Sequence, residues 1–356
     1  MSIFEHPDFD AHEAVHFVSD PRAGLLGIIA VHSTVLGPAA GGTRFWNYAD
    51  SYEALTDALR LSRAMSLKNA MAKIPHGGGK GVLIRPSDWL DRKALFAAYG
   101  RRLNVTNGTY YTAEDVGVSP DDMEVIRSQT PYVAGLDTGE AASGDPSPVT
   151  ADGVFRGLKV AIKHGLKAQK FEGLTVAVQG LGSVGYALCG HLHKAGAKLL
   201  VADINADVLT KAKAEFGAEV VAPEAIHAAT ADIYAPCALG GAVNPNTIGE
   251  IKAGIIGGAA NNQLLTPKMG ETLQEQGKLY CPDYVINGGG IINVASELSG
   301  TYDPKWVDGK LEDLAKTLDD VISQSRKTGR ATHVISEEMA LSRIEAQRPA
   351  ISTSDR

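Results

Sequence analysis

Three glycines, Gly180, Gly182 and Gly185, stand at the spacing that lets a backbone approach phosphate groups. They follow an apolar run over residues 174–179, which predicts a buried strand, and they open a segment with helical periodicity. The first glycine permits a tight turn, the second allows close approach to a pyrophosphate, and the third allows close helix packing. Because a helix N-terminus also attracts phosphate charge, this pattern predicts a dinucleotide-binding βαβ unit.

The acid Asp203 ends the next predicted strand, over residues 198–203. A carboxylate there can accept hydrogen bonds from both hydroxyls of an adenosine ribose, whereas it would repel a 2′-phosphate. Ile204 and Asn205 supply no arginine to compensate, so the sequence favours NAD over NADP. The residues expected to bind this cofactor are Gly180, Leu181, Gly182, Ser183, Val184, Gly185, Asp203 and Ile204.

Two lysines stand in unusual surroundings for charged residues. Lys68 has small or apolar neighbours, and Lys80 directly follows three consecutive glycines and begins an apolar run. The alternatives are a side chain extended along the surface for Lys68 and a solvent-facing strand residue for Lys80. A Walker phosphate loop is excluded, because Ile74 occupies a position that needs glycine and Gly81 follows Lys80. Both lysines are therefore candidates for chemistry.

A candidate acid, Asp115, lies just past the predicted strand over residues 110–112, where open α/β sheets bind ligands. Glu114 beside it is the competing acid. An acid in a loop is also a common turn former, so this alternative stays open. The histidines have no convincing metal-ligand spacing, and we expect no metal.

The elements that would position these residues alternate along the chain. Before residue 139, strands are expected over residues 25–32, 81–84 and 110–112. Helices are expected to start near Asp50, Leu90 and Ser119, and Glu53 completes a capping box with Asp50. Residues 139–148 collect glycine, serine, aspartate and two prolines, so we place a domain boundary near Pro148. Beyond it, a helix capped by Thr150, strands over residues 232–234 and 255–258, and helices over residues 206–216, 267–276, 311–325 and 337–346 are expected. This alternation predicts an α/β fold with a doubly wound sheet in the second half.

Composition excludes several classes of protein. The chain has 356 residues, 44% of them hydrophobic, and a net charge of -7 without a long basic run. It is therefore long enough for two domains, and nucleic acid is not an expected partner. The first residues lack a signal-peptide pattern, and the longest apolar run is too short to span a membrane. Three separated cysteines indicate a reducing compartment, so a cytoplasmic location is expected.

Several segments together resemble one enzyme family, the glutamate/leucine/phenylalanine/valine dehydrogenases. The resemblance covers nearly the whole chain in order, and within the family it is closest to the leucine dehydrogenases. The segments that carry it are Gly37-Pro-Ala-Ala-Gly-Gly-Thr-Arg44, Met65-Ser-Leu-Lys-Asn69, Gly77-Gly-Gly-Lys80, Thr112-Ala-Glu-Asp-Val-Gly117, Asp145-Pro-Ser-Pro-Val-Thr150, Asp232-Ile-Tyr-Ala-Pro-Cys-Ala-Leu239, Ala259-Ala-Asn-Asn-Gln263 and Pro282-Asp-Tyr-Val-Ile-Asn287.

The resemblance implies reversible, NAD-dependent oxidative deamination of an L-amino acid to a 2-oxo acid and ammonium. It also implies a substrate-binding, catalytic and oligomerisation domain over residues 1–148 and a Rossmann NAD-binding domain over residues 149–330. A cleft is expected between them, and residues 331–356 are expected to form a helical segment that packs back on the first domain. A homo-oligomer assembled through the N-terminal domain is the expected state.

Roles for individual residues also follow from the resemblance. Lys68 matches the lysine that binds the substrate carboxylate, and Lys80 matches the catalytic lysine that activates water. Asp115 matches the acid that exchanges protons with the substrate amine. The other matched residues are Gly41 and Gly42 in the pocket backbone, Asn262 for substrate and nicotinamide ribose, Thr150 for the nicotinamide amide, Ala238 for the cofactor, and Ala113 for the substrate.

Side-chain specificity is implied by the positions that match the family's pocket wall. Glutamate-using members hold the distal carboxylate with a lysine and a serine where this chain has Ala40 and Val294, so glutamate is disfavoured. Leucine-type members usually carry leucine in place of Ala40 and valine in place of Ile291. An apolar branched-chain substrate is expected, with an aromatic amino acid such as phenylalanine as the alternative.

Two other classes compete with this interpretation. A nucleotide-binding sensor could have kept the fold and lost catalysis, but Lys68, Lys80, Asp115 and Asn262 are all present. A 2-hydroxy acid dehydrogenase would need a catalytic His and Arg pair and would leave Lys80 without a role.

Overall fold

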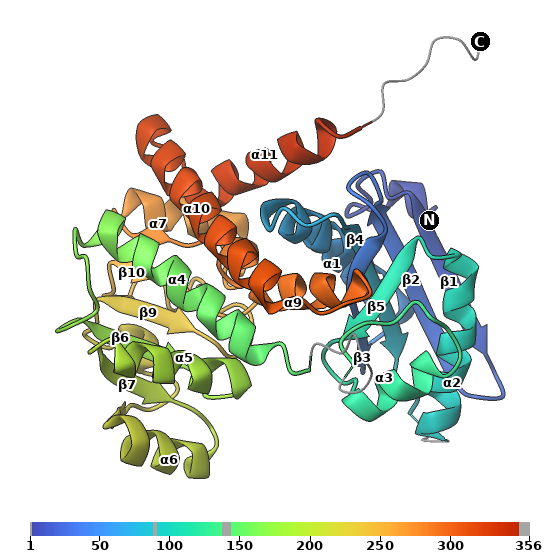
Figure 1. Cartoon of the computed structure of the whole chain (residues 1–356), viewed down its shortest axis with the longest axis horizontal. Coiled ribbons are helices and arrows are strands. Elements are labelled where there is room, and N and C mark those ends of the chain that lie inside the picture. The colour runs from blue at the N-terminus through green and yellow to red at the C-terminus, as the bar shows by residue number, and fades with distance from the viewer. Residues whose placement is uncertain (1, 88–90, 137–143, 349–356) are drawn as a thin grey trace. The chain divides into compact units, whose positions relative to one another are not determined.

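The computed structural model describes residues 2–87, 91–136 and 144–348, and these residues form two compact units (Figure 1). The first unit comprises the described residues of Met1–Asp145, Val294–Asp303 and Ala340–Arg356. The second comprises Pro146–Asn293 and Pro304–Met339. The assignment of residues 1–148, 149–330 and 331–356 to separate roles stays a prediction, and the expected connection over residues 139–148 lies partly outside the described residues.

The first unit is built on a five-stranded mixed sheet with the order β1-β2-β4-β3-β5. Its strands are β1 (Ala14–Asp20), β2 (Leu25–Ser33), β3 (Ala39–Trp46), β4 (Gly77–Ile84) and β5 (Tyr110–Glu114). Strand β3 lies between β4 and β5 and runs parallel to both. Strands β2, β4 and β5 match the predicted strands, whereas the sequence analysis missed β1 and β3. Strand β3 was not predicted, because its Ala-Ala-Gly-Gly start has low strand propensity. In the folded chain, tertiary packing overrides this propensity.

Glycines in β4 let a long helix lie directly on the sheet. A Cβ on Gly78 would come within 2.1 Å of the Ser66 nitrogen in helix α1 (Ser51–Met71). The Asn69 side chain of the same helix donates hydrogen bonds to the carbonyls of Gly77 and Ala40, at 2.5 and 3.3 Å. The predicted strand over residues 81–84 therefore starts four residues earlier than expected, because the glycine run is part of it.

Helix caps in the first unit follow the sequence closely. The Asp50 carboxylate accepts a hydrogen bond from the Glu53 N–H at 2.8 Å, as predicted, but the Glu53 carboxylate accepts from Ala49 instead of closing a full capping box. Helix α2 (Arg92–Leu103) is capped by Asp91, and Leu90 lies outside the described residues. Helix α3 (Pro120–Arg127) has a capping box formed by Ser119 and Asp122.

The second unit contains a six-stranded parallel sheet with the order β11-β10-β9-β6-β7-β8. Its strands are β6 (Thr175–Gln179), β7 (Lys198–Ala202), β8 (Glu219–Val220), β9 (Ile233–Pro236), β10 (Ile255–Ile256) and β11 (Leu279–Tyr280). The strand order reverses between β6 and β9, which is the position where doubly wound sheets bind ligands. The predicted α/β, doubly wound class is confirmed.

The second unit also contains six helices among its described residues. They are α4 (Ser147–Gly165), α5 (Ser183–Lys194), α6 (Ala206–Phe216), α7 (Pro267–Glu275), α8 (Asp283–Ile286) and α10 (Pro304–Thr328). The prediction that Thr150 caps the first of them is wrong, because α4 begins three residues earlier. Pro148 occupies its first turn, where the fixed φ of proline suits a helix and its missing N–H costs nothing.

Two further helices, α9 (Gly289–Leu298) and α11 (Thr332–Glu345), each contain one of the points at which the chain passes from one unit to the other. Helix α9 begins in a run of three glycines, which hid it from propensity arguments. At the end of α11, Arg343 donates to the carbonyls of Ala70 and Met71 at 3.3 Å, so this end of the helix is tied to α1 within the first unit.

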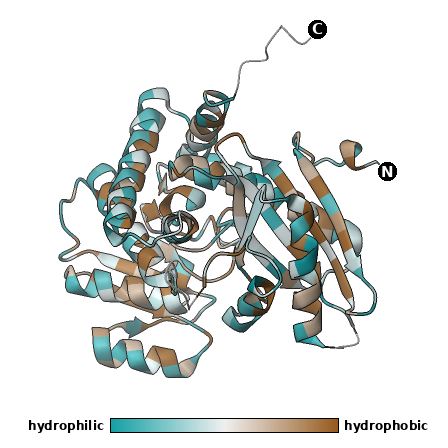
Figure 2. Ribbon diagram, turned by 45° about the vertical axis from the view of Figure 1, so that its right-hand side comes forward, coloured by the Kyte–Doolittle hydropathy of each residue, from teal (hydrophilic) through white to brown (hydrophobic). Residues whose placement is uncertain are grey.

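Apolar residues collect on the sheets and on the inner faces of the helices. Figure 2 shows helices with both hydrophilic and hydrophobic residues and strands that are largely hydrophobic or neutral. Phe45, Phe96, Tyr99 and Tyr110 are fully buried in the core of the first unit. Within the described part of the chain, no helix is long and apolar enough to cross a membrane.

Candidate active site

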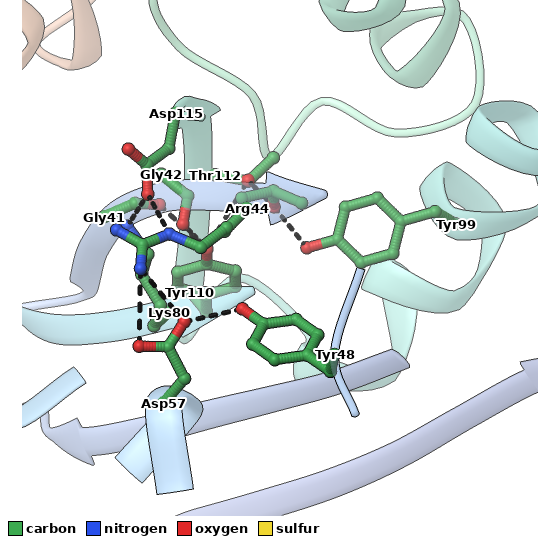
Figure 3. Close-up of polar contacts among 11 residues, drawn as sticks. Gly41, Gly42, Arg44, Tyr48, Asp57, Lys80, Tyr99, Tyr110, Thr112 and Asp115 are labelled. Carbon is green, nitrogen blue, oxygen red and sulfur yellow. Dashed lines mark hydrogen bonds and ion pairs between the residues drawn. The ribbon is translucent and has the colours of Figure 1, made fainter. Parts of the chain in front are cut away.

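An ion pair between Lys80 and Asp115 forms the centre of the candidate site (Figure 3). Lys80 lies on β4 and Asp115 directly follows β5, so their contact has to cross β3. The register places Gly42 of β3 between them, opposite Ala113 of β5. A Cβ on Gly42 would come within 2.8 Å of the Asp115 Cβ, so glycine leaves the room that this pair needs. It is Asp115 that pairs with Lys80, while the competing acid Glu114 is exposed.

Asp115 is ionised because of its neighbours. Burial by itself would raise the pKa of its carboxyl, but the charges of Lys80 and Arg44 outweigh burial and hold the pKa well below its ordinary value. The lysine is only 5% exposed. Asp115 itself is half-buried, with 19% of its side chain exposed. Opposite charges in contact and shielded from solvent are common at sites of acid–base chemistry.

Arg44 is a third charged residue at this site, and the sequence analysis assigned it no role. Its Nε lies 3.4 Å from the Asp115 Oδ2, and its Nη1 donates to both carboxylate oxygens of Asp57, at 3.0 and 3.3 Å. The Tyr48 hydroxyl donates to the same Asp57 carboxylate at 2.5 Å. Burial by itself would lower the pKa of Arg44, but the carboxylates of Asp115 and Asp57 raise it. The sequence feature that could have drawn attention to Arg44 is its position directly before the aromatic pair Phe45-Trp46.

Backbone and hydroxyl contacts hold β3 in place beside the ion pair. The Tyr110 hydroxyl donates to the Gly41 carbonyl at 2.8 Å, and a Cβ on Gly41 would meet the Gly79 oxygen at 2.0 Å. On the same strand, the Thr43 hydroxyl lies 2.6 Å from the hydroxyls of both Tyr99 and Thr112. The strand cannot shift without breaking these buried contacts.

Lys68, the second lysine singled out in the sequence, lies in the last turn of α1 and is half-buried. Met65, one turn before it, would contact a Cβ on Gly41 at 3.0 Å. The lysine therefore belongs to the turn of α1 that packs against β3 next to the ion pair.

The residues expected to form the side-chain pocket are buried and apolar. Ala40, Ala113 and Val294 belong to the first unit, with 0%, 8% and 7% exposure. Ile291, at 8% exposure, belongs to the second unit. These side chains contain no group that could pair with a charge.

The three glycines of the second unit adopt the conformations that their predicted roles require. Gly180 has a φ of +95°, and a Cβ on it would lie 2.8 Å from Ala238, at the strand-order reversal between β6 and β9. A Cβ on Gly185 would meet the Gly180 oxygen at 2.0 Å. Gly182 caps α5, and a Cβ on it would meet nothing within 4 Å, so open space lies in front of this helix N-terminus.

A cavity of about 750 Å³ lies along this edge of the sheet, and five predicted cofactor residues line it. These are Gly180, Gly182, Asp203, Ile204 and Ala238. The Asp203 carboxylate accepts from the backbone N–H groups of Leu181 at 2.6 Å and Asn205 at 2.8 Å, which fixes its position. Ser183 and Val184 begin α5 immediately after the capping glycine. Its volume lies within the usual range of small-molecule and cofactor pockets.

Thr150 and Asn262 also belong to the second unit. The Thr150 hydroxyl donates to the Pro146 carbonyl at 2.9 Å. Asn262 is exposed and has a φ of 52°, in the left-handed region that few residues adopt, and its carbonyl accepts from the Gly241 N–H at 2.8 Å. Strained backbone of this kind often marks a ligand contact. In the described ranges, no cluster of histidine, cysteine and acidic residues could hold a metal ion.

Comparison with known proteins gives the same family over both parts of the chain. Residues 12–132 match the family described as Glu/Leu/Phe/Val dehydrogenase, dimerisation domain. Residues 201–349 match the family described as Glutamate/Leucine/Phenylalanine/Valine dehydrogenase.

Individual relatives match almost end to end. Leucine dehydrogenase of Geobacillus stearothermophilus is 47% identical over 99% of this chain and 96% of that protein. Valine dehydrogenase of Streptomyces coelicolor is 39% identical over 97% of this chain and 95% of that protein. The crystal structure of L-tryptophan dehydrogenase from Nostoc punctiforme has a TM-score of 0.82 and 41% identity, and covers 95% of this chain and 97% of that one.

Proposed function

Because the chain belongs to the glutamate/leucine/phenylalanine/valine dehydrogenase family and is an amino acid dehydrogenase that uses a nicotinamide cofactor, we propose that it deaminates an apolar L-amino acid with NAD. The proposed reaction converts the amino acid, NAD⁺ and water into a 2-oxo acid, ammonium, NADH and a proton, and it is reversible. The observation that carries this proposal is the ion pair of the buried Lys80 with the half-buried Asp115, beside the glycine backbone of β3.

Three side chains of the first unit divide the chemistry between them. Lys68 binds the substrate carboxylate through a charge-assisted hydrogen bond, which orients the amino acid. Asp115 accepts a proton from the substrate ammonium group, and Lys80 orients and activates the water that attacks the imino carbon. When bound, NAD accepts the hydride from the substrate Cα.

The cofactor proposal rests on the second unit. Gly182 leaves open space before α5 for a pyrophosphate, and Asp203 lines the cavity without a neighbouring arginine. We therefore expect much higher kcat/KM with NAD than with NADP, since a 2′-phosphate would meet the Asp203 carboxylate. Equal values for both coenzymes would contradict this. Asp203→Ser combined with Ile204→Arg should narrow the difference.

The substrate proposal rests on the absence of charge in the matched pocket residues. Ala40 and Val294 offer no partner to a distal carboxylate, and burying that charge unpaired would cost several kcal/mol. Leucine, valine and isoleucine are the proposed substrates, in line with the leucine and valine dehydrogenases among the relatives.

An aromatic substrate is the second candidate, and the small side chain of Ala40 favours it together with the likeness to L-tryptophan dehydrogenase. NADH formation across a panel of L-amino acids separates the two. Ala40→Leu should lower kcat/KM for phenylalanine more than for valine, because it refills the pocket wall. An unchanged ratio would show that Ala40 does not line the pocket.

The same assay tests the competing classes. A catalytically inactive sensor would bind NADH but form none from any amino acid. A 2-hydroxy acid dehydrogenase would reduce 2-oxo acids without ammonium, whereas the proposed enzyme needs ammonium for the reverse reaction.

A homo-oligomer assembled through the first unit is also proposed, because residues 12–132 match a family domain described as a dimerisation domain. Light scattering on the purified chain tests it, and a monomeric mass at micromolar concentration would contradict it.

A further inference from the structure

Arg44 contacts two acids that lie on different elements. On one side, its Nε faces the Asp115 Oδ2 after β5, and on the other, its Nη1 binds Asp57 in α1. The side chains of Arg44 and Asp57 are only 22% and 24% exposed, so this bridge is shielded from solvent. A guanidinium group suits such a bridge, because its planar fork binds carboxylates in fixed directions.

The register of the sheet explains why Arg44 reaches Asp115. Thr43 of β3 lies opposite Glu114, the last residue of β5, so the residues that come next along the chain, Arg44 and Asp115, are neighbours as well. Lys80 approaches the same carboxylate from β4, on the other side of β3. Two cations from adjacent strands therefore converge on one carboxylate.

Both cations are closest to the same oxygen of Asp115, Oδ2. Figure 3 shows the other carboxylate oxygen turned away from them. With Oδ2 held between Lys80 and Arg44, the carboxylate cannot rotate freely, and Oδ1 keeps one orientation.

Arg44 is itself held from behind. Asp57 accepts from it at 3.0 Å, and the Tyr48 hydroxyl donates to the same Asp57 oxygen at 2.5 Å. Burial raises the pKa of Tyr48, and its hydrogen bond to Asp57 raises it further, so the hydroxyl stays a donor. Tyr48 and Asp57 thus hold Arg44 in place, and Arg44 in turn holds Asp115.

Resting on the proposed function, we propose that Arg44 is a positioning residue that aims the Oδ1 of Asp115 at the substrate ammonium group, and that Asp57 fixes Arg44 for this role. In this arrangement, Oδ1 takes the ammonium proton while Oδ2 stays bound to Lys80 and Arg44. The charged groups facing Asp115 are Lys80 and Arg44, and Asp57 contacts Arg44 from α1.

The test is a double-mutant cycle on amino acid oxidation at saturating NAD. Arg44→Gln should lower kcat/KM by about 10- to 100-fold, since misplacing a reacting group by about 1 Å can cost 100-fold. Arg44→Lys, which keeps the charge but not the fork, should fall between Arg44→Gln and the wild type. Asp57→Asn should lower kcat/KM by about 3- to 10-fold, because Arg44 stays present but less fixed.

The decisive comparison is in the Asp115→Asn background. There, Arg44→Gln and Asp57→Asn should each change the residual rate by less than about 2-fold, because the group they position is gone. Arg60→Gln is the matched control. Arg60 lies on α1 and pairs with Asp8 at 2.7 Å, but its side chain is 66% exposed, so its loss should change neither background.

The outcomes separate this inference from the proposed function. If Asp115→Asn keeps normal turnover, the proposed role of Asp115 fails and this inference fails with it. If Asp115→Asn is slow while Arg44→Gln is normal, only this inference is overturned. Equal losses from Arg44→Gln in both backgrounds would also overturn it, because they would show a general structural effect. If Arg44→Gln does not fold, the same comparison with Asp57→Asn decides.

Discussion

The ion-pair site of the first unit depends on charged side chains, whereas the glycine-lined cavity of the second unit depends mainly on backbone conformation. At the ion pair, charged side chains from β3, β4, α1 and the end of β5 meet and neutralise one another. In the cavity, the decisive features are backbone conformations within one short turn, and Asp203 is bound to backbone N–H groups. A single motif thus supplies the decisive backbone geometry of the cavity, whereas the ion-pair site exists only after four elements have assembled.

This difference predicts different sensitivity to mutation. Removing a charge from the first site takes one counter-charge away from a network of solvent-shielded groups, so the charges that remain are no longer balanced. Adding a methyl group to the second site acts through space and backbone strain. The following predictions test this contrast.

The largest effect is expected for Lys80→Ala. A positioned acid–base group contributes about 10²- to 10⁴-fold, and Lys80 also stabilises developing charge, so turnover should fall by about 10³-fold or more. NADH binding, measured by fluorescence, should stay nearly unchanged because the cavity belongs to the second unit. Lys93→Ala, an exposed lysine on α2, is the control. Near-normal turnover in a folded variant would contradict the assignment.

A second effect concerns buried imidazoles in the first unit. His32 is 8% exposed, and its Nδ1 lies 2.7 Å from the Ser66 hydroxyl. Its pKa is lowered from 6.5 to about 4, mainly by burial and also by the nearby charge of His12, while Asp10 opposes the shift. Because the folded state resists protonation, stability present above pH 6.5 should be lost as the pH falls towards 4.

His32→Gln should reduce this loss. At about 1.4 kcal/mol per pKa unit, the difference between the variant and the wild type should approach about 3 kcal/mol over that interval. Urea unfolding at pH 7 and pH 4.5 measures it. The same pH dependence in both proteins would show that His32 does not resist protonation.

The next effect is expected for Lys68→Ala. Hydrogen bonds to charged groups contribute about 1.5–3 kcal/mol, so KM for the amino acid should rise about 10- to 100-fold. The rate at saturating substrate should fall less than in Lys80→Ala. Steady-state kinetics tests this, and an unchanged KM would remove Lys68 from the carboxylate site.

The smallest effect is expected for Gly182→Ala. Its Cβ would meet nothing in the free protein, so thermal stability should be unchanged, but a pyrophosphate at the α5 N-terminus would meet the methyl group. NADH affinity should fall by about 10-fold, given that a misfit of this size costs about 1–3 kcal/mol.

Gly185→Ala is the contrasting variant for this motif. Its Cβ would overlap the Gly180 oxygen at 2.0 Å, so it should destabilise the second unit as well as weaken NADH binding. If both variants lose stability equally, the open space before α5 is not a ligand site.

Local signals in the sequence predicted the glycine turn after β6, most of the helices and the unusual surroundings of Lys68 and Lys80. Each of these features depends on residues that are close together in the chain. Gly180, Gly182 and Gly185 carry their own conformational requirements, and the caps at Asp50 and Ser119 do as well. Strand β3 was missed, because its glycine-rich start becomes a strand only when β4 and β5 pair with it. Residue types alone left Asp115 and Glu114 as alternatives, and the family resemblance favoured Asp115. The pairing of Asp115 with Lys80, and the bridge through Arg44 to Asp57, depended on the register of parallel strands. That register is a long-range property of the fold, so only the tertiary structure decided which charges would meet.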